Sequence, residues 1–214
     1  MPALPFEAFT RDRTALRGEL WPGGPDWVVM IHDFGADLDC WRPLIGPLLR
    51  SGHTVALLDL RGHGASDGTA DPTRLAEDVS AAVGLPRQHS ASSVTLVAAG
   101  LTAATALSAE VEPRPDCLIL LSPRLGDLDS RQLRGEGTVK LFLVGATDQE
   151  SDRVARELRG RSIGAAGVIS FATETQGADL LLTTWRDQVV EQTLGIINTV
   201  RLSPMPGSTE GETK

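Results

Sequence analysis

Nucleophilic catalysis needs a serine, threonine or cysteine side chain within reach of a base, and that base is most often a histidine. The chain has four histidines, and none follows His89 in the remaining part of the sequence. The candidate nucleophiles are Cys40, Ser66, Thr102, Cys117 and Ser122. None of them has a histidine at a spacing that marks a catalytic pair. The carboxylate most favourably placed for acid–base work is Asp148, directly after an apolar run.

Other kinds of chemistry find less support in the sequence. The two cysteines, Cys40 and Cys117, are too few and too far apart for a disulfide framework or a zinc knuckle. Both are expected to behave as small hydrophobic residues. No cluster has metal-ligand spacing, and neither a G-x-x-x-x-G-K-[ST] nor a G-x-G-x-x-G phosphate loop is present. We therefore predict no metal and no cofactor.

Composition limits the class of protein further. The 214 residues are 41% hydrophobic and 22% charged, which is typical of a single globular domain. The net charge of −8 makes a nucleic-acid partner improbable on physical grounds, because no excess of Lys and Arg is available to neutralise phosphates. No apolar run approaches a membrane span and no leader pattern is visible, so we predict a soluble, cytoplasmic protein that does not bind membranes. The oligomeric state is left open.

The elements that must position these residues alternate along the chain. Short apolar runs typical of buried strands occur at residues 28–31, 54–60, 94–98, 117–121, 139–144 and 167–171. Helical spacing is found at residues 39–51, 71–83, 100–109, 152–161 and 184–200, and residues 6–20 could form an edge hairpin. Residues 1–202 are expected to form one domain, and residues 203–214 a disordered tail.

This alternation predicts an α/β fold with a doubly wound, mostly parallel sheet and helices on both faces. Ligands in such folds bind at the carboxyl ends of the strands. The loops that follow the predicted strands are therefore where function is expected.

Several of these loops resemble segments of the α/β-hydrolase superfamily. The segment IHDFG at residues 31–35 matches its HGxG motif, and DLRGHGASDG at residues 59–68 matches the loop after the next strand. Residues 118–123 (LILLSP), 141–148 (LFLVGATD) and 175–181 (TQGADLL) resemble later strand ends, most like small esterases and dienelactone hydrolases. The resemblance covers about residues 5–200. It implies an α/β-hydrolase fold, and the short connection of residues 122–138 predicts no cap domain.

The resemblance also implies where a catalytic triad would be, and two of its members are replaced. The G-x-S-x-G nucleophile turn corresponds to the segment around Ala98, with Gly100 at the serine position. Gln176 stands where the family has its histidine, and an amide cannot act as a general base near neutral pH. Asp148 stands at the position of the acid. It could be a residual triad member, or it could only cap the helix that follows.

The family's oxyanion hole uses backbone N–H groups, which here would be those of Phe34 and Leu101. These donors could bind a small carboxylate or carbonyl ligand, or they could only cap a helix and bind water. His32 and His63 belong to matching motifs and are expected to orient loops, and His32 is also a candidate ligand-binding residue. His53 and His89 are expected to face solvent, and Thr102 to face the packing of its helix. We expect an open, shallow cleft bordered by Phe34, Leu101, Arg124 and Leu125.

Two hypotheses follow from the sequence. The first is a catalytically degenerate α/β-hydrolase-fold protein that binds a small ligand or a protein partner. The alternative is an active serine-hydrolase-like enzyme of carboxylesterase or thioesterase type, with a non-standard constellation around Asp148, His32 or Ser122.

Overall fold

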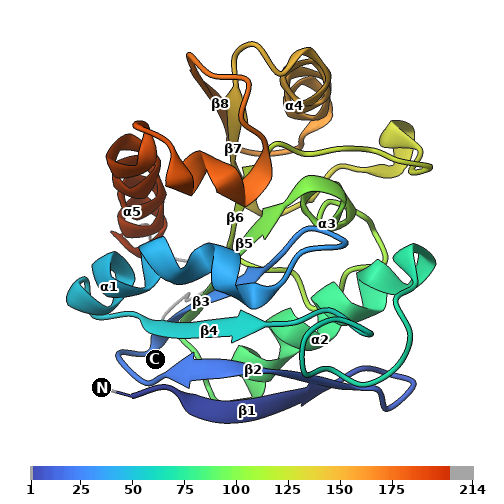
Figure 1. The fold of residues 1–214 in the computed structure, drawn as a ribbon, viewed down its shortest axis with the longest axis vertical. Helices are drawn as coiled ribbons and strands as arrows, with labels where there is room; N and C mark the ends of the chain where they lie inside the picture. The colour runs from blue at the N-terminus through green and yellow to red at the C-terminus, as the bar shows by residue number, and fades with distance from the viewer. Residues whose placement is uncertain (1, 203–214) are drawn as a thin grey trace, which may run out of the picture.

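The computed structural model describes residues 2–202, so the expected tail at residues 203–214 lies outside the described residues. A single sheet of eight strands runs through the molecule in the order β1-β2-β4-β3-β5-β6-β7-β8 (Figure 1). The strands are β1 (Leu4–Phe9), β2 (Ala15–Trp21), β3 (Asp26–Ile31), β4 (Thr54–Leu58), β5 (Ser93–Ala99), β6 (Cys117–Leu121), β7 (Val139–Gly145) and β8 (Ala166–Phe171). The β1–β2 hairpin joins the sheet antiparallel to β4, and all other neighbours are parallel. The predicted doubly wound, mostly parallel sheet is confirmed.

Helices cover both faces of the sheet (Figure 1). They are α1 (Arg42–Arg50), α2 (Leu75–Gln88), α3 (Gly100–Thr105), α4 (Gln149–Arg161) and α5 (Arg186–Leu202). Side chains of α1 and α5 belong to one apolar cluster, and side chains of α2, α3 and α4 belong to another. Because successive strand residues point to opposite faces, Val28 lies in the first cluster and Val29 in the second.

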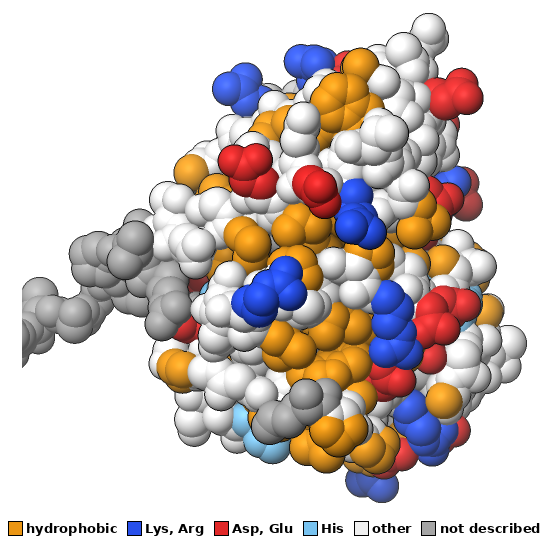
Figure 2. Space-filling view, turned by 60° about the vertical axis from the view of Figure 1, so that its left-hand side comes forward, with side chains coloured by type: hydrophobic (Ala, Val, Ile, Leu, Met, Phe, Trp, Pro, Cys, Tyr) orange, Lys and Arg blue, Asp and Glu red, His pale blue; other side chains and the backbone are white. Residues whose placement is uncertain are grey.

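One side of the molecule presents α1 and α5 together. Figure 2 looks onto this side, where hydrophobic side chains gather near the middle and blue side chains are interspersed among them. A shallow hollow of about 440 Å³ lies between the two helices and is lined by Pro43, Pro47, Val190 and Leu194 beside charged residues such as Arg50.

Several element boundaries differ from the expected ones for local reasons. The strand expected at residues 54–60 ends at Leu58, and the carboxylate of the next residue, Asp59, accepts hydrogen bonds from loop N–H groups. The helix expected at residues 71–83 begins as a 3-10 turn, where Asp71 accepts a hydrogen bond from the Thr73 N–H. It then continues as α2 to Gln88, well past the expected end. The helix expected at residues 100–109 is shorter and ends at Thr105.

The carboxyl ends of β3, β5 and β6 lie side by side, since these three strands are consecutive in the sheet. This edge is left uncovered by the connection from β6 to β7, which contains only the 3-10 turn Ser130–Gln132. The expected absence of a cap domain agrees with this short connection. Within residues 2–202, no helix has both the length and the apolar character needed to cross a membrane.

Candidate functional site

The turn between β5 and α3 has the backbone shape that a side chain rarely tolerates. Gly100 has a φ of 56°, in the left-handed region that glycine adopts without strain. A Cβ atom added there would lie 2.0 Å from Oδ2 of Asp33 and 2.1 Å from its Cγ. The position that the resemblance matches to the nucleophile therefore holds a glycine, and the space for a side chain there is occupied by a neighbouring carboxylate.

Asp33 comes from the loop after β3, and both of its carboxylate oxygens have partners. Oδ1 accepts hydrogen bonds from the backbone N–H of Phe34 and from that of Leu101, each at 2.8 Å. Oδ2 forms an ion pair with the guanidinium of Arg124. The Arg124 backbone is itself held in place, because its N–H donates to the Gly100 carbonyl at 3.0 Å. Groups from the segments that follow β3, β5 and β6 thus meet at one carboxylate.

The two backbone donors expected at an oxyanion hole are therefore close together, but the chain's own Asp33 fills the space between them. Sequence reasoning missed Asp33. The available signal was its position in IHDFG, since this aspartate stands where the matching HGxG motif has glycine. The two loops have exchanged features: Asp33 brings a side chain where the motif has none, and Gly100 lacks one where the motif has serine.

A cleft of about 220 Å³ opens beside this carboxylate. The residues that line it come from the loops after β3, β5, β6 and β8: Asp33, Ala36, Cys40, Ala99, Gly100, Ser122, Arg124 and residues 176–179. The expected border is only partly correct, because Arg124 lines the cleft whereas Phe34, Leu101 and Leu125 do not. The side chains of these three pack against the apolar cluster under α2 and α3. Phe34 and Leu101 contribute to the site through their backbone N–H groups and not through their side chains.

Ser122 lies at the inner wall of this cleft, directly after β6. Its φ of 44° is unusual for a residue with a side chain, and its N–H donates to the Leu143 carbonyl at 2.9 Å. The residue is fully buried, and its hydroxyl has no hydrogen-bond partner among the described residues. A buried hydroxyl without a partner is unfavourable by about 1–3 kcal/mol unless a ligand or water satisfies it.

The two other positions implied by the resemblance lie in different surroundings. Gln176 lines the cleft and is exposed, and its side chain does not cap the 3-10 turn Gly177–Leu182 that follows it. Asp148 is buried outside the cleft lining, and its Oδ1 accepts from the Ser151 N–H at 3.3 Å as the N-cap of α4. Among the described residues, its Oδ2 has no hydrogen-bond partner. Of the two interpretations, the structure displays the helix cap.

His32 does not have the ligand-binding position that was a candidate for it. It is fully buried, and its ring nitrogens lie 2.7 Å from the Asp33 carbonyl and 3.1 Å from the Leu60 N–H. His63 accepts from the Gly35 N–H at 3.0 Å through Nε2. Both rings are therefore engaged with loop backbone. They hold the loop that carries Asp33 against the loop that follows β4.

Asp59 completes this network from the end of β4. The carboxylate accepts from the N–H groups of Leu38 at 3.0 Å and Ala65 at 3.3 Å, and the His32 ring lies 3.5 Å away. Burial by itself raises the pKa of Asp59, but the His32 ring and the two N–H groups outweigh it and lower the pKa below its usual value. The carboxylate is consequently held in its charged form.

The two cysteine thiols are poorly suited to act as nucleophiles. Burial, followed by the charges of Asp37 and Asp179, raises the pKa of the Cys40 thiol far above its usual range. Burial raises the pKa of Cys117 to about 12. Both cysteines are unpaired, and neither is held as the reactive thiolate.

The expected burial of three other residues can be compared with the structure. Thr102 is fully buried within α3, as expected for a residue that faces helix packing. His89 is exposed as expected, but His53 was expected to face solvent and is fully buried at the start of β4. Among residues 2–202, no group of three or more His, Cys, Asp and Glu side chains is arranged to hold a metal ion.

Comparison with known proteins identifies the family. The model of the alpha/beta hydrolase family matches residues 28–204, which is most of the chain. The chain belongs to this family. The resemblance noted for the strand-end motifs therefore extends over the whole sheet from β3 onward.

Solved esterase structures share the fold of this α/β-hydrolase family member. An esterase from Pyrococcus furiosus superposes with a TM-score of 0.75 at 14% identity, covering 92% of this chain and 91% of that one. An esterase from Exiguobacterium antarcticum superposes with a TM-score of 0.70 at 16% identity, covering 91% of this chain and all of that one. At such low identity these likenesses establish the fold alone.

A curated relative matches a smaller part of the chain. The dihydrolipoyllysine-residue acetyltransferase component of the acetoin cleaving system of Cupriavidus necator is 46% identical over 55 residues. This match spans 26% of the present chain and 14% of the relative.

Proposed function

We propose that this α/β-hydrolase-fold protein is a pseudoenzyme that binds a small ligand and does not hydrolyse esters. The observation that carries the proposal is the carboxylate of Asp33, which lies where a side chain at position 100 would project. It also accepts from both backbone N–H groups that would have to stabilise an oxyanion. The expected cytoplasmic location remains part of the proposal.

The absence of a suitable base among the cleft residues supports the same proposal. Gln176 replaces the family's histidine, and the lining residues of the cleft include no histidine at all. Loss of a triad serine or histidine lowers kcat by about 10⁶ in a serine hydrolase. Neither thiol offers a substitute, since burial disfavours both thiolates.

The surroundings of Asp33 suggest which ligand the cleft would take. Phe34, Leu101 and Arg124 together supply donors to both oxygens of one carboxylate. Asp33 and Arg124 keep 21% and 42% of their side-chain area exposed, so the Asp33 side chain can leave without disturbing the core. We propose that a small carboxylate ligand takes the place of the Asp33 carboxylate, with the buried Ser122 hydroxyl as a further contact.

Removal of the internal carboxylate tests the proposed ligand class. Asp33→Ala leaves two N–H groups and a guanidinium without their acceptor, so we expect a loss of about 2 kcal/mol in the free energy of unfolding. Sodium acetate should then raise the melting temperature of Asp33→Ala more than sodium chloride at equal ionic strength does. The wild-type protein should show a much smaller difference between the two salts, because its own Asp33 carboxylate competes with acetate.

The matched control is Arg124→Gln in the Asp33→Ala background, which should reduce the acetate effect. An acetate effect equal in the wild type and in Asp33→Ala would contradict the carboxylate site. The non-catalytic assignment is tested separately, with a fluorophosphonate probe and a panel of short-chain esters on the wild-type protein. We expect no labelling and no turnover.

The alternative function, an esterase or thioesterase with a non-standard constellation, is favoured by Ser122 alone. Its hydroxyl is unpartnered, lines the cleft and sits on an unusual backbone conformation. Fluorophosphonate labelling that disappears in Ser122→Ala would establish this alternative and overturn the pseudoenzyme proposal.

A further inference from the structure

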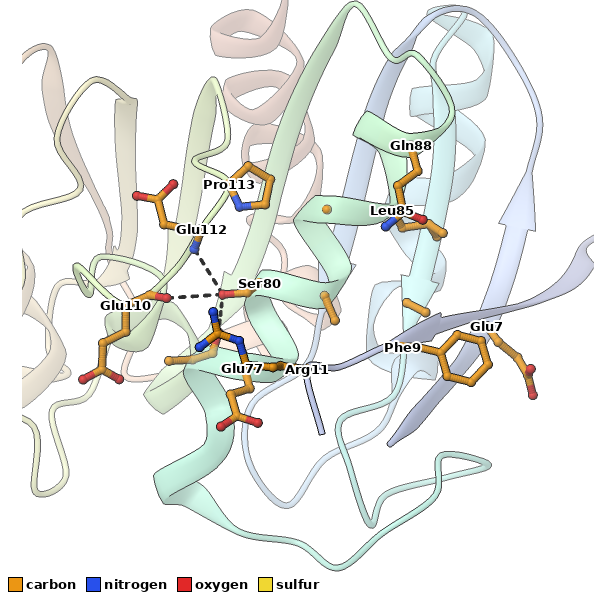
Figure 3. Close-up of a pocket in the computed structure, with 14 residues that line it drawn as sticks. Glu7, Phe9, Arg11, Glu77, Ser80, Leu85, Gln88, Glu110, Glu112 and Pro113 are labelled. Carbon is orange, nitrogen blue, oxygen red and sulfur yellow. Dashed lines mark hydrogen bonds between the residues drawn. The ribbon is translucent and has the colours of Figure 1, made fainter. Parts of the chain in front are cut away.

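A further hollow lies away from the cleft, between α2 and the edge strand β1 (Figure 3). It has a volume of about 630 Å³ and shares no lining residue with the cleft. We name it the α2–β1 groove, and the residues that line it are Glu7, Ala8, Phe9, Arg11, Ala76, Glu77, Ser80, Ala81, Gly84, Leu85, Gln88, Glu110, Glu112 and Pro113.

The floor of the groove is apolar and built from small residues. Ala76, Ala81, Gly84 and Leu85 belong to α2 and leave the helix backbone open to close approach. Phe9 stands at the β1 wall with 62% of its surface exposed, which is unusual for so large an apolar side chain. The floor therefore suits apolar side chains from outside the chain.

The rim of the groove is acidic. Its charged residues are four glutamates and one arginine: Glu7, Glu77, Glu110, Glu112 and Arg11. Three of the glutamates have an arginine neighbour within ion-pair distance, at 2.8 to 3.4 Å. The pairs that Glu7 and Glu112 form are exposed and weak, so a partner's cations can replace their arginines. Glu77 is held more firmly, because it also contacts the buried guanidinium of Arg61 at 3.4 Å. The net charge of −8 for the whole chain reinforces the negative potential of the rim.

The walls of the groove are held in place by internal bonds. The loop that carries Glu110 and Glu112 is tied to α2, because the Glu112 N–H donates to the Ser80 hydroxyl at 3.1 Å (Figure 3). On the other side, Asp12 in the β1–β2 turn forms ion pairs with Arg61 at 3.0 Å and Arg74 at 2.7 Å. A groove with fixed walls loses little conformational freedom when a partner binds.

We propose that the α2–β1 groove is a docking site for a basic, amphipathic segment of a partner protein. Apolar side chains of that segment would contact Phe9 and the floor of α2, while its Lys and Arg side chains would meet the glutamates of the rim. Charge complementarity selects this occupant, because a second copy of the chain would bring the same net charge of −8.

The proposal can be tested with a fluorescein-labelled peptide that has Lys and Leu at helical spacing. We expect the full chain to bind this peptide, and Glu110→Lys with Glu112→Lys to weaken binding at least about tenfold, or about 1.4 kcal/mol. The matched control is Glu136→Lys with Glu174→Lys, two exposed glutamates outside the groove. It changes the net charge equally and should leave the affinity within about twofold.

A second pair of variants tests the floor. A Cβ atom at Gly84 would have only Pro113 nearby, at 3.6 Å, so Gly84→Ala should fold at least as stably as the wild type. Gly84→Leu should fill the groove and abolish peptide binding. The proposal is overturned if the peptide does not bind or if both charge-reversal pairs weaken binding equally. Concentration-dependent self-association that Gly84→Leu removes would likewise overturn it, in favour of a second copy as occupant.

Discussion

The loops at the carboxyl edge of the sheet form two halves, and the polar side chains of these halves differ in their hydrogen bonding. In the loops after β3, β4 and β5, polar groups are joined in a continuous network through His32, Asp59 and Asp33. In the loops after β7 and β8, Asp148 keeps a buried oxygen without a partner among the described residues, and Gln176 faces solvent. Side chains join the loops of the first half. The loops of the second half are joined by backbone hydrogen bonds, from the Ala146 N–H to the Phe171 carbonyl at 2.7 Å and from the Thr147 N–H to the Thr173 carbonyl at 3.2 Å.

This difference indicates which residues the fold depends on. Network residues in the first half each hold backbone groups of another loop, so their removal leaves buried donors unsatisfied. In the second half, the exposed Gln176 can change at little cost. Substitutions in each half can test whether the stability of the fold depends on the first half more than on the second.

The largest effect is expected at Gly100. In Gly100→Ala, the added Cβ collides with the Asp33 carboxylate and the residue keeps a positive φ. We expect the free energy of unfolding to fall by about 3 kcal/mol or more, measured by chemical denaturation. Gly100→Ser with Gln176→His should give no esterase while Asp33 remains.

The control for this prediction is the double variant Asp33→Gly with Gly100→Ala. If the two side chains compete for one space, a double-mutant cycle should show a favourable coupling of about 1–3 kcal/mol. Additive effects of the two substitutions would contradict direct competition.

A smaller effect, and the sharpest contrast between the halves, is expected for His32→Ala against Gln176→Ala. His32→Ala removes a fully buried ring with two backbone partners, and we expect a loss of about 2–3 kcal/mol in the free energy of unfolding. Gln176 is exposed, so Gln176→Ala should stay within about 0.5 kcal/mol of the wild type. Equal losses in the two variants would show that the halves do not differ.

The smallest effect concerns acid stability and Asp59. Because its pKa is lowered in the folded state, the stabilisation it provides is present above about pH 4 and is lost as the pH falls through the folded pKa. Asp59→Asn should lower the stability at pH 7 by about 1 kcal/mol. It should also show a shallower loss of stability below about pH 4 than the wild type. Parallel curves of melting temperature against pH would contradict the role of this carboxylate.

Much of the fold could be predicted from the sequence, because buried parallel strands are marked by short apolar runs. The predicted strand at residues 117–121 coincides with β6, and the β1–β2 hairpin lies at the expected edge. Boundaries were less accurate where a side chain forms a loop bond, as Asp59 does after β4. The burial of His53 was missed because its position before β4 gave no sign of what covers it.

The backbone groups of the site could be predicted from the sequence, but the presence of the Asp33 carboxylate between them could not. The turn at Gly100 and the donors at Phe34 and Leu101 could be located from motif order. The hydrogen bonds from these donors to the Asp33 carboxylate could not be predicted. They depend on how closely two loops approach each other, and Asp33 and Gly100 are 67 residues apart in sequence. The replacement of a motif glycine by Asp33 was the only trace of it.

The attachment of the Asp33 carboxylate to the chain has a consequence for any search for ligands. A tethered group acts as a competitor at an effective concentration in the millimolar range or above, whatever the dilution of the protein. Suppose that the Asp33 carboxylate is away from the N–H groups of Phe34 and Leu101 in about one molecule out of a hundred. The apparent Kd of a ligand for these donors is then about a hundredfold weaker than its intrinsic value. Screens at micromolar concentration would therefore pass over genuine ligands of the wild-type protein, and Asp33→Ala is the form in which to look for them.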